Sequence, residues 1–471
     1  MEGPPDIRVL IVGAGIGGLL LAILLEKAGI PYMVIERTST FRPLGSAISL
    51  SAAVQPLLEQ LGLLDEINEA SKPEQAAYFY DESLTRIGAV DAVFSKERYG
   101  YYVRMLSRPT LYNILLRRIP KEKILLGKRV IGVEQTETRA MVRCADQSVH
   151  EADVVVGADG AYSAVRQNMF RELDQRHKLR SSDAKPMAID QECVVGTTEP
   201  LDPARFPIVG EEFSTLHIVL SVDRQYAFWA VPVEDNRLSW IIGHKLEDKD
   251  YRKQETFKSS EWGPEAAEEI CSKVRHLNCP VSGSIDEIIN STKPSLRSRV
   301  FLEEKLFKTW TSGRVVLLGD GAMQAMFDAV SIANHLSELE HNTVEAISTC
   351  FQAYYDERKK SAKDAVHGSR QVSTILSSHG WAVDVARKVS LSYVPDWLVR
   401  LIRDKTSSVR PQAIFLQRVP DRGSVRAKPT RVSVRALEFC RIRRQRAAAA
   451  AALLMTQQQL ATKQASLNSF V

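Results

Sequence analysis

A glycine-rich turn near the amino terminus restricts the fold of this chain more than any other feature. Residues 7–12 form a short run rich in Ile and Val, which is the pattern of a buried strand. Gly13, Gly15 and Gly18 follow this run, and residues 19–29 then have the apolar pattern of a helix that ends at a glycine. A strand that enters a helix through a G-x-G-x-x-G turn is typical of a Rossmann-type dinucleotide-binding unit.

An acidic residue stands at the place where this type of unit binds a ribose. Residues 31–35 form a second strand-like run, and Glu36 follows it 18 positions after Gly18. That distance is close to the ~20 residues typical of the ribose-binding carboxylate. The open glycines allow a diphosphate to approach the free N–H groups of the helix start. The residues that we predict to contact an adenine dinucleotide here are Gly13, Gly15, Gly18, Glu36 and Arg37. The alternative is a βαβ unit that binds no nucleotide.

Length and composition limit the class of protein. The chain has 471 residues, of which 44% are apolar and 25% charged, so it can bury a large core and should form two or three structural units. These values exclude collagen-like, coiled-coil and wholly disordered proteins. The six cysteines lie far apart, without a C-x-x-C pair or a histidine at zinc-finger spacing. We therefore expect no metal site and no disulfide framework, and we expect a cytoplasmic protein with reduced thiols.

Positive charge is concentrated at the carboxyl end. Residues 410–471 contain 12 Lys or Arg against Asp421 and Glu438, a net charge of +10, which leaves −5 on residues 1–409. A nucleic-acid partner is therefore not expected. No stretch reaches the ~20 apolar residues of a membrane-spanning helix. The apolar residues 397–402 leave two alternatives open, which are contact with a membrane surface and packing against the body.

The order of elements predicts a Rossmann-type α/β domain that is interrupted by a second, mainly antiparallel sheet. We assign residues 1–180 and 295–345 to the first domain and residues 185–290, with their short β-rich runs and polar turns, to the second. Helices dominate residues 346–410. Residues 411–471 are expected to form a basic, disordered tail, with a loose helix as the alternative.

Three motifs in order along the chain resemble those of single-component flavin-dependent monooxygenases of the aromatic-hydroxylase type. The first is the glycine turn with Glu36 and Arg37. The second, residues 155–166, is similar to that family's G-A-D-G-x-x-S-x-V-R motif, which is associated with both FAD and the nicotinamide donor and includes Asp159. The third, residues 318–320, ends in an aspartate whose counterpart binds the ribityl chain of FAD. The resemblance implies FAD as the cofactor and NADPH or NADH as a transient electron donor.

Shorter matches resemble a fungal branch of this family that epoxidises or hydroxylates terpenoid or meroterpenoid intermediates. They are residues 42–47, 106–109, 354–358 and 393–397. The resemblance implies that Ala47 and Arg108 contact FAD. For Arg108 the alternative is a solvent-facing arginine at a helix start, and for Asp159 it is a turn former ahead of a glycine.

The sequence departs from this family directly after the third motif. Relatives carry a longer loop there, with a His or similar residue, a Pro and a G-Q-G run, and that loop lines the flavin ring. In this chain Asp320, Gly321 and Ala322 lead almost directly into a helix. We assign these three residues to the cofactor site, and the shortened loop raises the hypothesis of an inactive FAD-binding paralogue.

A catalytic residue is harder to assign. In flavoenzymes the cofactor makes and breaks the bonds, while the protein positions the reactants and excludes water from them. Tyr226 is our candidate, in an aromatic group with Phe228, Trp229 and Trp240. These side chains either wall a hydrophobic substrate pocket or pack in the sheet core.

The resulting hypothesis is an FAD-dependent monooxygenase that uses NAD(P)H and O2 to hydroxylate or epoxidise a hydrophobic small molecule. Two alternatives stay open, namely a flavin oxidoreductase that inserts no oxygen and the inactive paralogue.

Overall fold

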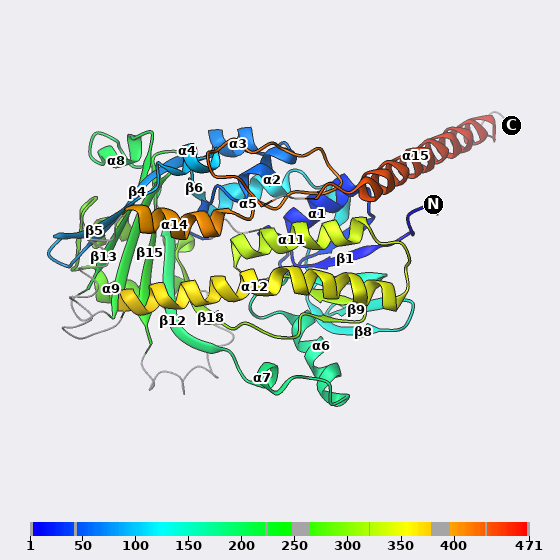
Figure 1. Cartoon of the computed structure of the whole chain (residues 1–471), viewed down its shortest axis with the longest axis horizontal. Coiled ribbons are helices and arrows are strands. Elements are labelled where there is room, and N and C mark those ends of the chain that lie inside the picture. The colour runs from blue at the N-terminus through cyan, green and yellow to red at the C-terminus, as the bar shows by residue number, and fades with distance from the viewer. Residues whose placement is uncertain are drawn as a thin grey trace.

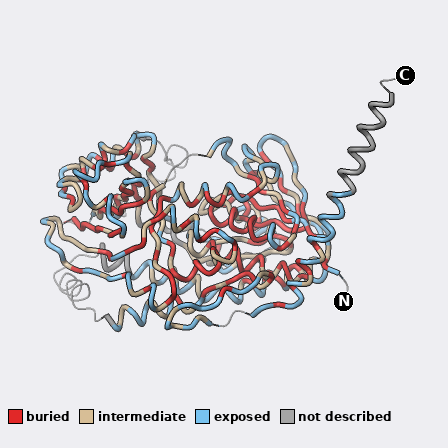
Figure 2. Tube along the Cα trace, turned by 90° about the horizontal axis from the view of Figure 1, so that it is seen from above, coloured by how far each residue is buried: buried red, intermediate tan, exposed pale blue. Residues whose placement is uncertain are grey.

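The computed structural model describes residues 3–41, 45–221, 225–246, 264–319, 321–377, 396–428 and 431–468. These residues form two large sheets, with helices packed on both (Figure 1). Figure 2 shows that the buried residues gather in two regions, one around each sheet.

A six-stranded sheet holds the amino-terminal glycine turn at its centre. In spatial order its strands are β19 (Thr311–Ser312), β20 (Val315–Leu317), β11 (Val154–Gly157), β1 (Val9–Val12), β2 (Tyr32–Ile35) and β7 (Ile124–Leu125). All neighbours pair in parallel except β19 and β20. β1 and β11 are apolar along their whole length because both faces of this sheet are covered.

Helices α1 (Ile16–Ala28), α5 (Arg108–Leu116), α11 (Ala322–Ser337) and α12 (Val344–Ser377) form the layer on one face. The other face carries α6 (Ala164–Gln175) and a small antiparallel sheet of β8 (Val130–Gln135), β9 (Ala140–Cys144) and β10 (Val149–Ala152). The sheet and its two layers form a Rossmann-type domain.

The second sheet has nine strands and is mainly antiparallel. Its order is β18 (Ser298–Glu304), β12 (Ala188–Thr197), β15 (Arg237–Lys245), β14 (Tyr226–Val233), β13 (Ser214–Leu220), β4 (Lys72–Tyr80), β6 (Arg104–Ser107) and β3 (Ala47–Leu50), with β5 (Arg86–Asp91) paired to β4. β4 and β13 pair in parallel, so the sheet is mixed.

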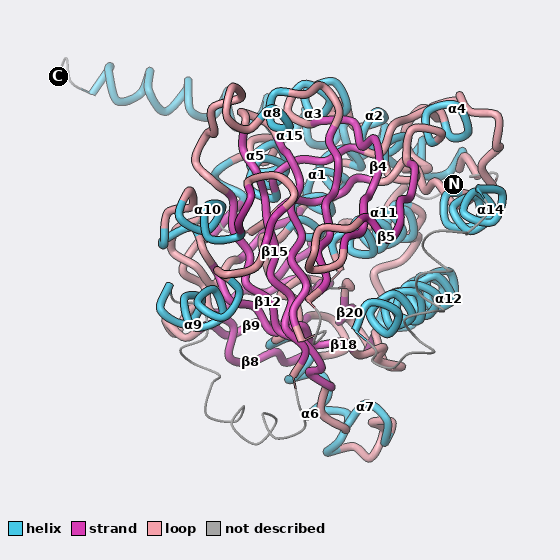
Figure 3. Tube along the Cα trace, turned by 90° about the vertical axis from the view of Figure 1, so that its left-hand side faces the viewer, coloured by secondary structure: helices cyan, strands magenta, loops and turns pink. Residues whose placement is uncertain are grey.

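The two faces of this sheet have different surroundings (Figure 3). One face packs on α9 (Pro264–Val274) and α10 (Ile285–Asn290) and carries Phe228 and Trp240. We call it the far face. The opposite face, the near face, carries Val231 and Val233, which cluster with Ala47 and Met105 of the strands next to the Rossmann domain.

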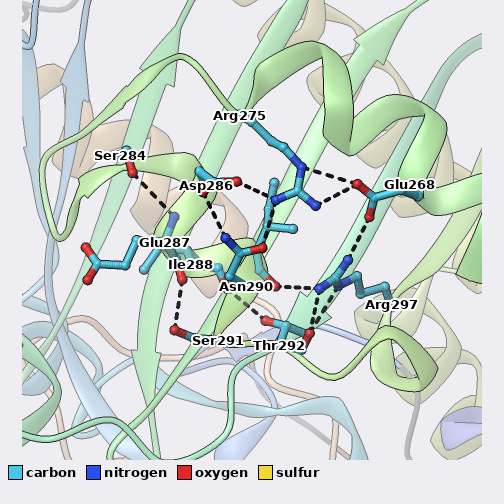
Figure 4. A network of polar contacts seen from close by, with 11 residues as sticks. Glu268, Arg275, Ser284, Asp286, Glu287, Ile288, Asn290, Ser291, Thr292 and Arg297 are labelled. Carbon is cyan, nitrogen blue, oxygen red and sulfur yellow. Dashed lines mark hydrogen bonds and ion pairs between the residues drawn. The ribbon is translucent and has the colours of Figure 1, made fainter.

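A polar network fastens the helical layer to the far face (Figure 4). Arg297, which is buried, donates to the carbonyl oxygens of Ile289 and Thr292 and pairs with Glu268 at 2.8 Å. Glu268 also accepts from Arg275 at 2.6 Å. Because this network ties α9 to α10, the far face is a closed core.

The remaining elements are short or peripheral. They are α2 (Gln55–Gln60), α3 (Leu64–Glu69), α4 (Ser95–Tyr99), α7 (Ser181–Ala184), α8 (Pro207–Gly210), α14 (Asp396–Ser407), α15 (Val434–Asn468), the 3-10 helices Lys121–Lys123 and Pro294–Leu296, and a hairpin of β16 (Asn278–Cys279) and β17 (Gly283–Ser284). No helix in the described ranges combines the length and apolarity needed to cross a bilayer.

The predicted fold class, a Rossmann-type domain with a second, mainly antiparallel sheet, is confirmed. The second sheet is not confined to residues 185–290, however. Strands from residues 47–107, which we assigned to the first domain, and β18 both join it. Residues 104–107 form β6. β4 and β5 pair as a local hairpin, but β4 also pairs with the distant strand β13, which no local sequence pattern indicates.

The expected disordered tail is wrong for the described residues after 410. Residues 410–428 and 431–446, which we call the strap, lie against the Rossmann domain. Phe415 and Ala436 are buried in the main core, and Ala413 exchanges hydrogen bonds of 2.8 and 3.0 Å with the side chain of Gln60. The basic composition misled the prediction, because several arginines bind backbone carbonyls instead of facing solvent. Examples are Arg410 to Val425 and Arg443 to Ser337. Beyond the strap, α15 extends away from the body (Figure 1).

We predict that Phe415→Ala lowers the free energy of unfolding by about 3–5 kcal/mol, because it leaves a cavity in the main core. Val434→Ala is the matched control at a side chain that is 77% exposed, and it should change the stability by less than about 0.5 kcal/mol. Urea denaturation of both variants measures the difference. Equal effects would show that the strap is not docked.

Candidate cofactor site

The predicted cofactor residues meet at one edge of the six-stranded sheet. Gly13 follows β1, Glu36 follows β2, Ala158 and Asp159 follow β11, and Leu318 follows β20. These four strands are parallel neighbours, so their carboxyl ends share the same edge. This edge is where open α/β sheets bind ligands.

The glycine turn is built by backbone contacts that exclude a side chain. Gly13 has φ 107°, and a Cβ atom there would lie 2.5 Å from the carbonyl oxygen of Ala158. A Cβ at Gly18 would lie 2.1 Å from the carbonyl oxygen of Gly13. Gly15, which caps α1, has no atom within 4 Å of its Cβ position. The start of α1 therefore opens onto unfilled space, which fits a diphosphate bound by the free N–H groups of a helix.

Glu36 is held beside this turn. Its Oε2 accepts the N–H of Ala14 at 2.9 Å, and its Oε1 accepts the N–H of Thr38 at the same distance. A carboxylate offers about four acceptor positions, so Glu36 keeps capacity for the hydroxyl groups of a ribose. The neighbouring Arg37 is exposed.

Tyr112 of α5 belongs to the same site, although the sequence did not suggest it. Its hydroxyl is buried, with no hydrogen-bond partner in the described part of the chain, and its ring packs against Phe41 at 5.3 Å. Burial raises the pKa of this hydroxyl, and the charge of Glu36 adds to the rise while Arg108 opposes it. Tyr112 is therefore a neutral O–H donor close to Glu36, the carboxylate that we predict to bind the ribose. One feature of the sequence could have indicated Tyr112. It follows Arg108 by four residues, and this spacing places both side chains on one side of a helix.

Ala47 begins β3 and Arg108 directly follows β6, and these two paired strands lie at one end of the nine-stranded sheet. The backbone N–H of Arg108 binds the carbonyl of Ser46 at 2.8 Å, and the stem of its side chain lies over Gly45. Ala47 opens β3 and faces the near side of the nine-stranded sheet.

Asp159 caps the start of α6. Its Oδ2 accepts the N–H groups of Ala164 at 2.6 Å and Val165 at 3.2 Å, and its Oδ1 has no partner among the described residues. Burial raises the pKa of this carboxyl, against the opposing effect of these hydrogen bonds. Asp159 is therefore at least a structural cap, and the unpaired oxygen is available to a ligand.

A buried ion pair fixes the short connection between β20 and α11. Asp328 accepts the N–H of Gly319 at 2.9 Å and pairs with Nε of Arg358 at 2.7 Å. Tyr354, four residues before Arg358 on the same helix, donates to the carbonyl of Leu317 at 3.1 Å. Burial raises the pKa of Asp328, although Arg358 opposes the shift. The motif of residues 354–358 therefore positions the connection, a role that the sequence comparison did not assign.

The three residues that we assigned to the cofactor site at the shortened loop have different outcomes. Asp320 lies outside the described residues. Gly321 is the cap of α11 and Ala322 its first residue, so both border the same edge. A Cβ atom at Gly17 would lie 2.6 Å from Leu318 and 2.8 Å from Ala325, which shows how closely α1 and α11 pack here.

Tyr226 is not brought together with these residues. It lies on the far face, where its ring stacks on His244 at 4.7 Å, and Nδ1 of His244 binds Glu192 at 2.8 Å. The sheet separates Tyr226 from Ala47, so its candidate catalytic role has no support in the geometry. Phe228 and Trp240 also pack in the far-face core, whereas Trp229 points to the near face.

The residues present fit the dinucleotide part of FAD. An open helix start, a carboxylate with spare acceptor positions and a buried hydroxyl without a partner among the described residues lie near the same edge of the sheet. In the described residues no group of three or more His, Cys, Asp or Glu is arranged to hold a metal ion.

Comparison with known families decides the identity of this site. Residues 6–369 match the family described as FAD binding domain. The chain belongs to this family. FAD is its cofactor, and the resemblance seen in the sequence motifs is confirmed.

Similar proteins are fungal FAD-dependent monooxygenases. The chain is 31% identical to esdpE of Penicillium shearii over 71% of this chain and 69% of that protein. It is 30% identical to ausM of Aspergillus calidoustus over 76% and 77% of the two chains. These relatives and the family match place this FAD binding domain protein among the FAD-dependent monooxygenases.

Solved structures share the fold. Klebsiella pneumoniae HpxO complexed with FAD and uric acid has a TM-score of 0.67 at 19% identity, covering 86% of this chain and 96% of that one. The crystal structure of FqzB has a TM-score of 0.64 at 20% identity, covering 89% and 98%.

Two glycine substitutions should separate folding from cofactor binding. Gly15→Ala should leave the stability unchanged, because its φ of −72° suits alanine and the space around it is open, yet it should weaken FAD binding at least about tenfold. Gly18→Ala should cost about 1–3 kcal/mol of stability through the backbone clash. Thermal unfolding and FAD titration of the apoprotein measure both. Full FAD affinity in Gly15→Ala would contradict the placement of the diphosphate.

Tyr112→Phe should weaken FAD binding about three- to tenfold, since it removes one hydrogen bond to the cofactor. The stability of the FAD-free protein should not fall, because the lost hydroxyl has no partner there. Tyr102→Phe, a tyrosine change next to β6, is the control. If Tyr112→Phe destabilised the apoprotein while its FAD affinity stayed normal, Tyr112 would be structural only.

Proposed function

We propose that this FAD-dependent monooxygenase uses NADPH or NADH and O2 to hydroxylate or epoxidise a hydrophobic small molecule of the terpenoid type. The observation that carries the proposal is the position of the cofactor edge next to an apolar part of the near face. Ala47 clusters directly with Val231 and Val233 of the near face. Thr197 of the same sheet donates to the carbonyl of Gly45 at 3.4 Å. An apolar substrate on this face would lie beside the cofactor.

The protein's part in such a reaction is to bind, orient and exclude water. When bound, FAD supplies the electron transfer and the oxygen-insertion chemistry. The start of α1, Glu36 and Tyr112 would hold its dinucleotide part. The apolar near face would keep water away from the reacting substrate. The names of the fungal relatives support the oxygenase class, and the terpenoid-type substrate follows from the sequence resemblance.

A second candidate is a flavin oxidoreductase that inserts no oxygen. The observation in its favour is the connection between β20 and α11, which consists only of residues 318–321. The N–H of Gly319 is already bound by Asp328, and the N–H of Leu318 donates to the carbonyl of Gly157. The connection therefore offers little to line a flavin ring, and a loosely held ring favours reduction of O2 without transfer to a substrate.

A membrane-surface contact stays part of the proposal. Trp397, Leu401 and Ile402 of α14 are 66%, 58% and 57% exposed. α14 is also fixed to the body, because Asp404 accepts from Tyr99 at 2.7 Å.

The deciding experiment is the absorbance spectrum of the purified chain before and after addition of NADPH, followed by the mass of the product formed from farnesol as a terpenoid probe. We expect a flavin spectrum that bleaches with NADPH and a product heavier by one oxygen atom. Loss of two hydrogens, or hydrogen peroxide alone, would favour the second candidate. A colourless protein that takes up no added FAD would contradict both.

Variants connect this result to the site. Glu36→Ala and Asp320→Ala should each lower the FAD content of the purified protein. Glu26→Ala removes a surface carboxylate from the other end of α1 and should leave the FAD content unchanged. Normal FAD content in both site variants would contradict the assignment.

A further inference from the structure

One buried donor on the near face has no partner. The indole Nε1 of Trp229 is buried and makes no hydrogen bond in the described part of the chain. Trp240, one strand away, offers a direct comparison, because its Nε1 donates to Thr292 at 2.9 Å on the far face. Leaving a buried donor unpaired costs about 1–3 kcal/mol, so such groups in native proteins call for an explanation.

The register of the strands places Trp229 on the near face. Trp229 pairs with Ile218 of β13 and Ile241 of β15, whereas Phe228 and Ala230 on either side of it belong to the far-face core. Two residues further, Val231 occupies the same face and joins the cluster with Ala47. At about 3.3 Å per residue, Trp229 lies about 13 Å along β14 from Val233.

The near-face positions closest to Trp229 on β14 and its two neighbouring strands carry no charged side chain. The near-face positions of the three central strands from Trp229 to Val231 are Trp229, Val231, Leu216, Ile218, Ile241 and Ser239. Of the helices that cover the sheet, α9 and α10 lie on the far face (Figure 3). The region therefore combines an apolar wall with a single oriented N–H donor, which is the composition of a small-molecule site.

We propose that Trp229 donates a hydrogen bond to an acceptor oxygen, such as a ketone or ether, on an otherwise apolar substrate. This inference rests on the proposed function and adds to it the substrate class that the near face selects. The apolar neighbours bind the hydrocarbon frame, and the indole N–H fixes its orientation relative to the cofactor edge at Ala47. A hydrocarbon that lacks the acceptor would leave the N–H unpaired and bind more weakly.

Calorimetric titration of the FAD-loaded protein with two probes tests this proposal. The probes are 2-decalone, a bicyclic ketone, and decalin, its hydrocarbon counterpart. Wild type should bind 2-decalone more tightly. Trp229→Phe should weaken 2-decalone binding about three- to tenfold and leave decalin binding unchanged, because only the N–H is lost.

Trp240→Phe is the matched control, since it removes an equivalent indole N–H from the far face and should change neither affinity. Equal effects of both variants on 2-decalone, no effect of Trp229→Phe, or no saturable binding of 2-decalone to wild type would each overturn the proposal. The FAD content of each preparation is measured separately. A protein without FAD would refute the proposed function, whereas an FAD-loaded protein with an unaffected Trp229→Phe variant would refute only this inference.

Discussion

Close backbone contact at the glycine turn determines how the Rossmann domain is assembled. The turn after β1 presses against the residues after β11, and α1 lies so near to α11 that no side chain fits at Gly17. These contacts bring the ends of β1, β2, β11 and β20 to one edge and leave the start of α1 open. A single residue with a Cβ atom at Gly13 or Gly18 would separate these elements. The cofactor crevice is thus a consequence of glycine packing, and the polar residues are placed around it.

The two faces of the nine-stranded sheet have different roles in our proposal. The far face is a structural core, and the near face would bind the substrate. The far face is closed by α9, α10 and a polar network around the buried Arg297, and the indole N–H of Trp240 has its partner within this core. The near face adjoins the cofactor edge and keeps an unpaired indole N–H. Oxygen transfer to an apolar compound needs such an arrangement, because the substrate must be held next to the cofactor without water.

Local sequence patterns predicted the parts of this molecule that depend on local interactions. The βαβ opening, Glu36 at the end of β2 and the class of the second sheet all follow from short-range periodicity and spacing. The sequence did not place Tyr226 on the far face, because one step along a strand reverses the face and alternation alone does not tell which face meets the cofactor. The partners of the hairpin at residues 72–91, the docked strap and the unpaired hydroxyl of Tyr112 depend on contacts between residues far apart in the chain. Composition even misled for the strap, since Arg443 and Arg444 bind carbonyl groups of the body.

The central claim is that an adenine dinucleotide lies with its diphosphate at the open start of α1 and its ribose beside Glu36. A crystal structure of the chain grown with FAD measures this directly. The account predicts density for the diphosphate over Gly15, a ribose hydroxyl on the Glu36 carboxylate and the hydroxyl of Tyr112 in contact with the cofactor. Density for FAD elsewhere, or this crevice closed by the protein's own side chains, would contradict it.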